Sequence, residues 1–95
     1  MRNYETIFIL KPSIDEEKRV EAIEKFKSII AADGEIEKVE EWGNRKLAYE
    51  IEKLREGYYV LVNFKANPTL PKELERNFKI SDDVLRYIIV NLEDK

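Results

Sequence analysis

The sequence predicts one domain over residues 1–95 with an α+β fold of the split β-α-β, or ferredoxin-like, type, in the order β-α-β-β-α-β. Four segments show the alternating or β-branched patterns that are typical of strands, and two segments show the spacing of three and four that is typical of helices. Each predicted helix lies between two strands. Because such crossovers are right-handed, we expect a four-stranded antiparallel sheet with the first and third strands in the middle and both helices on one face.

The first strand and the first helix are predicted from local composition. Residues 2–10 are rich in β-branched and aromatic side chains and are followed by Pro12, which cannot donate to a strand ladder. Ser13 stands three residues before Glu16, which is the spacing of a capping box at a helix start. The helix should end at Gly34 in a left-handed conformation. Its apolar positions are Val20, Ile23, Phe26, Ile29 and Ile30.

Residues 35–51 are predicted to form a long interrupted strand, because apolar residues alternate strictly from Leu47 onward. Seventeen extended residues at about 3.3 Å each would span about 56 Å, far beyond a domain whose radius of gyration should be about 12–13 Å. The strand must therefore bend, and Gly43-Asn44 is the place best suited to a bend. Residues 58–64 form the next and clearest strand, which pairs with the bent strand as a hairpin.

A second helix and a last strand complete the predicted order. The helix starts after Pro68, and its apolar residues Leu70, Leu74 and Phe78 lie one turn apart on a single stripe. Polar residues at 81–83 end the helix, and residues 84–90 form the last strand.

One face of the predicted sheet is apolar although no predicted helix covers it. Side chains alternate between the two faces of a strand, and the charged Glu5, Lys65 and Arg86 mark the positions that point away from the helices. Contiguous apolar patches on soluble proteins usually mark interaction surfaces, although strand propensity alone could also account for this composition. The outward apolar residues are Ile7, Ile9, Tyr59, Leu61, Ile88 and Val90. In the last strand the alternation assigns Leu85, Tyr87 and Ile89 to the core.

The composition argues against an enzyme. The chain has neither His nor Cys, so it lacks the side chain that titrates near neutral pH, thiolate nucleophiles and the commonest metal ligands. No apolar run approaches the ~20 residues that span a bilayer, and the N-terminus shows no signal-peptide pattern. We therefore expect a cytoplasmic protein with no cofactor, no metal, no membrane association and no small-molecule substrate.

The segment from Gly43 to Ile51 reads Gly-Asn-Arg-Lys-Leu-Ala-Tyr-Glu-Ile. It resembles the signature of the bacterial small-subunit ribosomal protein six family, in which a glycine and one or two basic residues precede Leu-Ala-Tyr and an apolar residue follows two positions later. The opening residues 1–5, the Gly-Tyr-Tyr at 57–59 and the order of elements are also similar to that family. The resemblance therefore covers essentially the whole chain.

The resemblance implies a structural constituent of the small ribosomal subunit that has no catalytic activity. It further implies that the protein binds the central domain of the small-subunit rRNA together with a small basic partner, ribosomal protein eighteen. The net charge of −3 is compatible with such a partnership, because an acidic chain gains little over its whole surface from the release of phosphate counterions.

Local charge suggests which residues contact each partner. Residues 35–52 hold six acidic residues against three basic ones, which suits a basic protein, whereas residues 53–67 hold three basic residues against one acidic residue, which suits RNA. The candidate RNA-binding residues are Arg2, Asn3, Lys53, Arg55, Tyr59 and Arg86. The candidate partner-binding residues are Glu40, Glu41, Trp42, Arg45, Lys46 and Tyr49.

Alternative interpretations apply to these residues and to the function. Charges on the second strand also protect an exposed sheet edge against aggregation, and a lone Trp42 is often packed internally. Residues 56–60 lack the basic residue and the stacking aromatic of an RRM, so base stacking across the sheet is not expected. The rival functions are a ferredoxin-like regulatory module that forms homodimers around a small molecule and an acylphosphatase-like enzyme, for which the loop at 11–14 offers no arginine.

Overall fold

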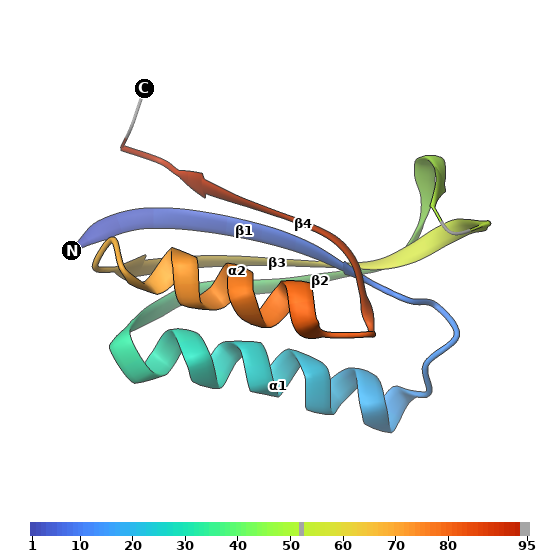
Figure 1. The fold of residues 1–95 in the computed structure, drawn as a ribbon, viewed down its shortest axis with the longest axis horizontal. Helices are drawn as coiled ribbons and strands as arrows, with labels where there is room; N and C mark the ends of the chain where they lie inside the picture. The colour runs from blue at the N-terminus through green and yellow to red at the C-terminus, as the bar shows by residue number, and fades with distance from the viewer. Residues whose placement is uncertain (52, 94–95) are drawn as a thin grey trace.

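The computed structural model describes residues 1–51 and 53–93, and its elements follow the predicted order (Figure 1). The predicted ferredoxin-like fold class is thereby confirmed. The elements are β1 (Arg2–Leu10), α1 (Glu16–Asp33), β2 (Gly34–Ile51), β3 (Leu54–Ala66), α2 (Leu70–Ile80) and β4 (Val84–Asn91).

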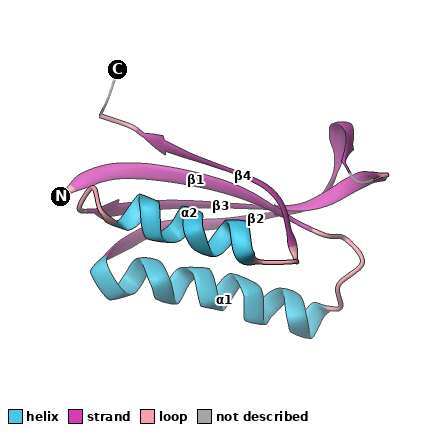
Figure 2. Ribbon diagram, in the orientation of Figure 1, coloured by secondary structure: helices cyan, strands magenta, loops and turns pink. Residues whose placement is uncertain are grey.

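The four strands form one antiparallel sheet in the order β2-β3-β1-β4, so β3 and β1 are central and β2 and β4 are the edges. Both helices lie on the same face of this sheet, as predicted (Figure 2). The radius of gyration is 13.0 Å. Neither described helix has the length and the apolar composition that crossing a membrane requires.

The core lies between the sheet and the two helices. Phe8 of β1 is fully buried, and its ring centroid lies 5.1 Å from that of Phe26 on α1 and 5.1 Å from that of Phe78 on α2. The three rings adopt edge-on and tilted arrangements, which aromatic groups prefer over face-to-face stacking. The stripe of Leu70, Leu74 and Phe78 is buried as predicted.

Helix α1 differs from the prediction at both ends and at one apolar position. Its N-cap is Asp15, which accepts a hydrogen bond from the Lys18 amide, and not Ser13. Val20 is exposed, since the half-buried Arg19 takes the place beside the sheet with its guanidinium over the ring of Tyr58. Gly34 is extended and not left-handed; a side chain there would collide with a backbone oxygen of β3.

Strand β2 bends where the sequence predicts a bend. Its pairing with β3 shifts register between Glu41 and Gly43, and Gly43 has a φ of 81°, which favours glycine. Beyond this bulge the end of β2 and the start of β3 curl away from the side of the sheet that carries the helices (Figure 1). We call residues 44–51 and 53–57 the hairpin.

Strand β4 contains a bulge, and because of it one core residue of this strand differs from the prediction. Its register with β1 shifts between Ile9, which pairs with Arg86, and Leu10, which pairs with Val84. The extra residue at this bulge is Leu85, so Val84 packs against the core in its place. Tyr87 and Ile89 pack against the core as predicted.

Candidate protein and nucleic-acid interface

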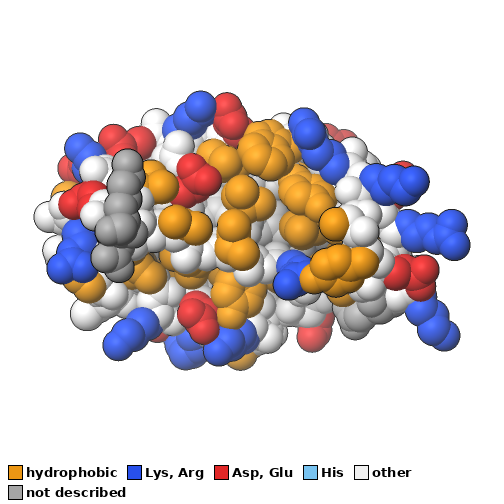
Figure 3. All heavy atoms as spheres, turned by 90° about the horizontal axis from the view of Figure 1, so that it is seen from above, with side chains coloured by type: hydrophobic (Ala, Val, Ile, Leu, Met, Phe, Trp, Pro, Cys, Tyr) orange, Lys and Arg blue, Asp and Glu red, His pale blue; other side chains and the backbone are white. Residues whose placement is uncertain are grey.

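The face of the sheet opposite the helices is apolar, as the alternation predicts. We call it the open face. Figure 3 views it directly and shows hydrophobic side chains gathered across its middle. Ile88 and Val90 of β4 are 53% and 43% exposed, whereas Leu61 of β3 is only 7% exposed. The open face therefore has an accessible apolar side along β4 and a well-covered centre on β3.

The strand register explains this difference in exposure. Ile7 of β1 pairs with Ile88 on one side and with Leu61 on the other, and Leu61 pairs in turn with Glu40 of β2. Neighbouring side chains on a sheet face shield one another, so residues on central strands are covered from both sides. Edge-strand residues such as Ile88 have a neighbour on one side only.

Aromatic rings and guanidinium groups gather where the hairpin meets the open face. We call Trp42, Arg45, Tyr49, Tyr59 and Arg86 the aromatic cluster. The Trp42 and Tyr59 rings stack with centroids 6.3 Å apart and an interplanar angle of 17°. The Arg45 Cζ atom lies 5.2 Å from the Trp42 ring centroid, and the Arg86 Cζ atom lies 5.0 Å from the Tyr49 ring centroid. A cation is attracted to the face of an aromatic ring, so these contacts tie the hairpin to β3 and β4.

The leucine of the Leu-Ala-Tyr string anchors the hairpin. Leu47 is 8% exposed, and its side chain lies beside Gly57. A Cβ atom on Gly57 would collide with the Ile9 side chain and would contact Leu47. The sequence alone predicts no packing role for Leu47 or Gly57, although both lie in the strings that carry the family resemblance.

Trp42 stacks on Tyr59 within the chain and remains partly accessible, and its contact with a protein partner stays a prediction. Its Nε1 donates a hydrogen bond to Glu40 Oε2 at 3.1 Å, and the residue is 36% exposed. The Glu40 carboxylate also lies 3.0 Å from the Lys38 ammonium group. Hydrogen bonding from Lys38, and then from Trp42, holds the pKa of Glu40 below its ordinary value. The indole therefore keeps a fixed orientation at the border of the open face.

The predicted partner-binding residues do not all lie on one face. Glu40 is on the open face, opposite Leu61, whereas Glu41 accepts a hydrogen bond of 2.7 Å from the Tyr58 hydroxyl beside α1. Arg19 of α1 covers the Tyr58 ring at 4.4 Å. Burial, and then the Glu41 carboxylate, raise the pKa of Tyr58. Glu41 thus lies on the helix side of the sheet.

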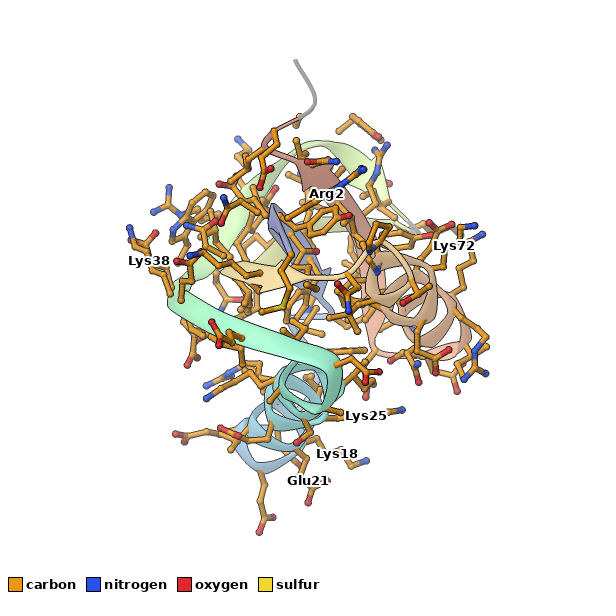
Figure 4. All side chains as sticks on the ribbon, turned by 90° about the vertical axis from the view of Figure 1, so that its left-hand side faces the viewer. Arg2, Lys18, Glu21, Lys25, Lys38 and Lys72 are labelled. Carbon is orange, nitrogen blue, oxygen red and sulfur yellow. The ribbon has the colours of Figure 1, made fainter. Side chains whose placement is uncertain are left out.

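The predicted RNA-binding residues form two separate groups. Arg2 and Asn3 begin β1 and pair with the end of β3, whereas Lys53 and Arg55 lie on the hairpin beyond the opposite ends of these strands. Figure 4 views the molecule from the end at which Arg2 lies. Asn3 Nδ2 donates to Glu93 at 3.0 Å, so this side chain is already engaged.

Three further residues lie apart from the group in which the sequence places them. Tyr59 and Arg86 are both predicted to contact RNA, but Tyr59 stacks on Trp42 and Arg86 lies over the Tyr49 ring. Lys46, which was expected to contact the protein partner, lines a cavity with Lys53 and Arg55. The structure therefore separates an aromatic group on the open face from a basic group on the hairpin.

Comparisons with known proteins agree over nearly the whole chain. The family model described as Ribosomal protein S6 matches residues 3–91. The small ribosomal subunit protein bS6 of Clostridium novyi is 63% identical, over 98% of this chain and 99% of the relative. The bS6 protein of Alkaliphilus oremlandii is 58% identical, over 98% of this chain and 99% of the relative.

A solved structure shows the same fold. The crystal structure of 30S ribosomal protein S6 from Thermotoga maritima matches with a TM-score of 0.92 and 37% identity, over 98% of this chain and 89% of that chain. The family consists of structural ribosomal proteins and not enzymes, which confirms the expectation drawn from the missing His and Cys residues. The matched relatives and the element order together show that the chain belongs to the ribosomal protein S6 family of the small ribosomal subunit.

Proposed function

We propose that the chain binds the central domain of the small-subunit rRNA together with ribosomal protein eighteen, as part of the ribosome in the bacterial cytoplasm. The family membership supports the ribosomal setting, and the resemblance of the signature string supports the two partners. The open face is the structural observation that carries the proposal, because it is an apolar surface that the described part of the chain does not cover.

The chemistry of the open face suits a protein partner better than bare RNA. Its accessible side along β4 is aliphatic, with Ile88 and Val90 exposed, and its border carries Trp42, Tyr49 and Arg86. Aromatic residues and arginine are enriched at the energetic centres of protein interfaces. The contacts within the aromatic cluster hold these side chains in place before binding, which reduces the conformational entropy that an interface loses.

The overall charge supports joint binding to RNA. A chain with a net charge of −3 gains little affinity for RNA from counterion release over its whole surface. A basic partner on the open face would supply the cations that this chain lacks. The local basic residues of the chain would then add contacts to an affinity that the partner dominates.

The experiment compares three titrations of a central-domain rRNA fragment: with this chain alone, with ribosomal protein eighteen alone, and with an equimolar mixture. We expect weak binding by the chain alone and binding by the mixture that is at least about tenfold tighter, which corresponds to roughly 1.4 kcal/mol of coupling. Tight binding by this chain alone, with a steep dependence on salt, would contradict the proposal.

A further inference from the structure

The two edge strands of the sheet differ in how they are protected against pairing with another strand. An edge strand presents unpaired amide and carbonyl groups, and native proteins protect such edges with charged side chains, prolines or bulges. β2 carries charged residues along its whole length, and its pairing with β3 shifts register after Ile36 and again after Glu41. β4 has a single charged residue, Arg86, and pairs regularly with β1 from there to Asn91. β4 is therefore the less protected edge (Figure 1).

The backbone direction of β4 follows from two hydrogen bonds to β1. The Leu92 amide donates to the Asn3 carbonyl at 2.9 Å, and the Thr6 hydroxyl donates to the Ile88 carbonyl at 2.8 Å. Backbone polar groups alternate in direction along a strand, so the even-numbered residues of this stretch face β1 and the odd-numbered residues face away from it. The residues whose amides and carbonyls point to the free edge are therefore Tyr87, Ile89 and Asn91. Among residues 1–51 and 53–93, no strand pairs with this edge.

The side chains beside the free edge form an apolar segment with a charge at each end. Ile88 and Val90 lie on the open face and are 53% and 43% exposed. Arg86 precedes this segment and Glu93 follows it, and both residues are exposed. The edge of β4 thus carries a cation at its start and an anion at its end.

We propose that the edge of β4 pairs with the same edge of a second copy of this chain, antiparallel and about a two-fold axis at Ile89. The two sheets then join into one continuous sheet, held by main-chain hydrogen bonds between the copies. This register pairs Ile89 with its own copy and Tyr87 with Asn91 of the second copy, so it uses every outward-facing residue of the stretch. A two-fold interface is closed and limits the assembly to a dimer.

Two features favour a second copy as the occupant of this edge. The register places Ile88 opposite Val90 of the second copy, and Val90 opposite its Ile88, so four exposed aliphatic side chains cover one another. The antiparallel direction also brings Arg86 to the end of the second copy that carries Glu93. Opposite charges therefore meet at both ends of the paired strands.

The helix that packs beside β4 is compatible with this dimer, which should be weak. In α2 the carboxylates of Glu73 and Glu75 lie 2.6 Å and 2.9 Å from nitrogen atoms of Arg76 and Lys79, so two helices brought close together would not repel strongly. An interface made by one strand and its surroundings is small, and small interfaces are transient. We expect a dissociation constant on the order of 100 µM.

The first test uses the full chain alone, so it can fail while the proposed function stands. Sedimentation velocity from about 10 µM to about 1 mM should show a monomer that converts to a dimer. Hydrogen exchange followed by NMR should show the Tyr87, Ile89 and Asn91 amides exchanging about fourfold more slowly at the highest concentration, because roughly 80% of the chain is then paired. The Ile88 and Val90 amides, which already face β1, should not change. A monomer at every concentration would overturn the proposal.

A matched pair of valine variants separates the edge from a general effect of added charge. Val90→Lys places a lysine beside the free edge, where lysine opposes strand pairing, and should weaken the dimer by at least about tenfold. Val20→Lys makes the same change on α1, where Val20 is 51% exposed, and should alter the dissociation constant by less than about twofold. Circular dichroism checks that both variants fold. Equal dissociation constants for the two variants would overturn the proposal.

Engineered thiols test the register, since the chain has no cysteine of its own. An Ile88→Cys chain is mixed with a Val90→Cys chain and oxidised. Facing residues that do not share hydrogen bonds have Cα atoms about 4.5 Å apart, within the range of a disulfide, whereas diagonal neighbours are about 7–8 Å apart. The mixed disulfide should therefore exceed either homodimeric product by at least about fivefold. A statistical mixture of products would overturn the pairing. Slower exchange of the outward-facing amides only after ribosomal protein eighteen is added would also overturn it, because the edge would then serve a different chain.

Discussion

Ile7 and Phe8 are neighbours on β1, yet Phe8 belongs to the core and Ile7 belongs to the open face. Phe8 is fully buried among the rings of Phe26 and Phe78, whereas Ile7 points to the open face beside Ile88. Both faces of the sheet are apolar, but only one has helices over it (Figure 2). Apolar composition alone therefore does not distinguish a core from an interface; what distinguishes them is whether the chain itself covers the surface.

The largest expected difference between the two faces is in stability. Phe8→Ala should lower the free energy of unfolding by about 3–5 kcal/mol, since it removes a buried ring and leaves a cavity between the sheet and both helices. Ile7→Ala should lower it by only about 1 kcal/mol, because Ile7 is half-buried. Denaturant unfolding followed by circular dichroism measures both values. Equal losses would show that the open face is as well packed as the core.

The Leu47 contact tests whether part of the open face already acts as a core. Leu47→Ala should lower the free energy of unfolding by about 2 kcal/mol, since Leu47 is buried beside Gly57 and Ile9. Tyr49→Ala, two residues further along the hairpin, is the control and should have an effect below about 1 kcal/mol, because Tyr49 is exposed. Thermal and denaturant unfolding would reveal the difference, and a larger effect at Tyr49 would contradict the assigned anchor.

The exposed side of the open face should affect binding and not folding. Ile88→Ser should change the free energy of unfolding by less than about 0.5 kcal/mol and should weaken binding to ribosomal protein eighteen by about tenfold or more. Ile80→Ser is the matched control, because Ile80 is also exposed but lies at the end of α2, away from the open face. Isothermal titration calorimetry compares the two variants. Equal affinities of the two variants for ribosomal protein eighteen would show that the open face is not the docking surface.

The smallest expected effect concerns Glu40 at the border of the open face. Its pKa is lowered by Lys38 and Trp42, so its contribution to stability is present above its ordinary pKa of 4.5 and is lost as the pH falls through the lowered value. The stability difference between the unchanged chain and Glu40→Gln should therefore shrink as the pH falls below about 4.5. Unfolding followed by Trp42 fluorescence measures this difference. A difference that grows on acidification would contradict the assigned hydrogen bonds.

Much of the fold could be predicted because the signals are local. The alternation on β1 and β3 assigned each side chain to the correct face, since the strand period is two and the charged Glu5 and Lys65 fixed its phase. The bend at Gly43 followed from chain length, because an extended strand of that length exceeds the size of the domain. The errors at Ser13 and Leu85 arose at a cap and at a bulge, where an offset of one or two residues decides the outcome.

The composition of the candidate sites could not be predicted in the same way. The opposite faces of the neighbouring Glu40 and Glu41 follow from the strand period of two, but the contact between Tyr49 and Arg86, which are far apart in the sequence, does not. That contact depends on how the hairpin curls over the sheet, and that curl results from the bulge at Gly43 together with the packing of Leu47.

The sequence by itself determined the order of the elements, the two apolar faces of the sheet and the likeness to a ribosomal family, because periodicity, composition and a short signature are properties of consecutive residues. Only the tertiary structure decided that Tyr59 and Arg86 join the aromatic cluster and that Lys46 joins Lys53 and Arg55. The physical reason is that a patch of charge or aromatic surface depends on distances in space, and a bulged hairpin changes those distances without any local sign of which residues it will bring together.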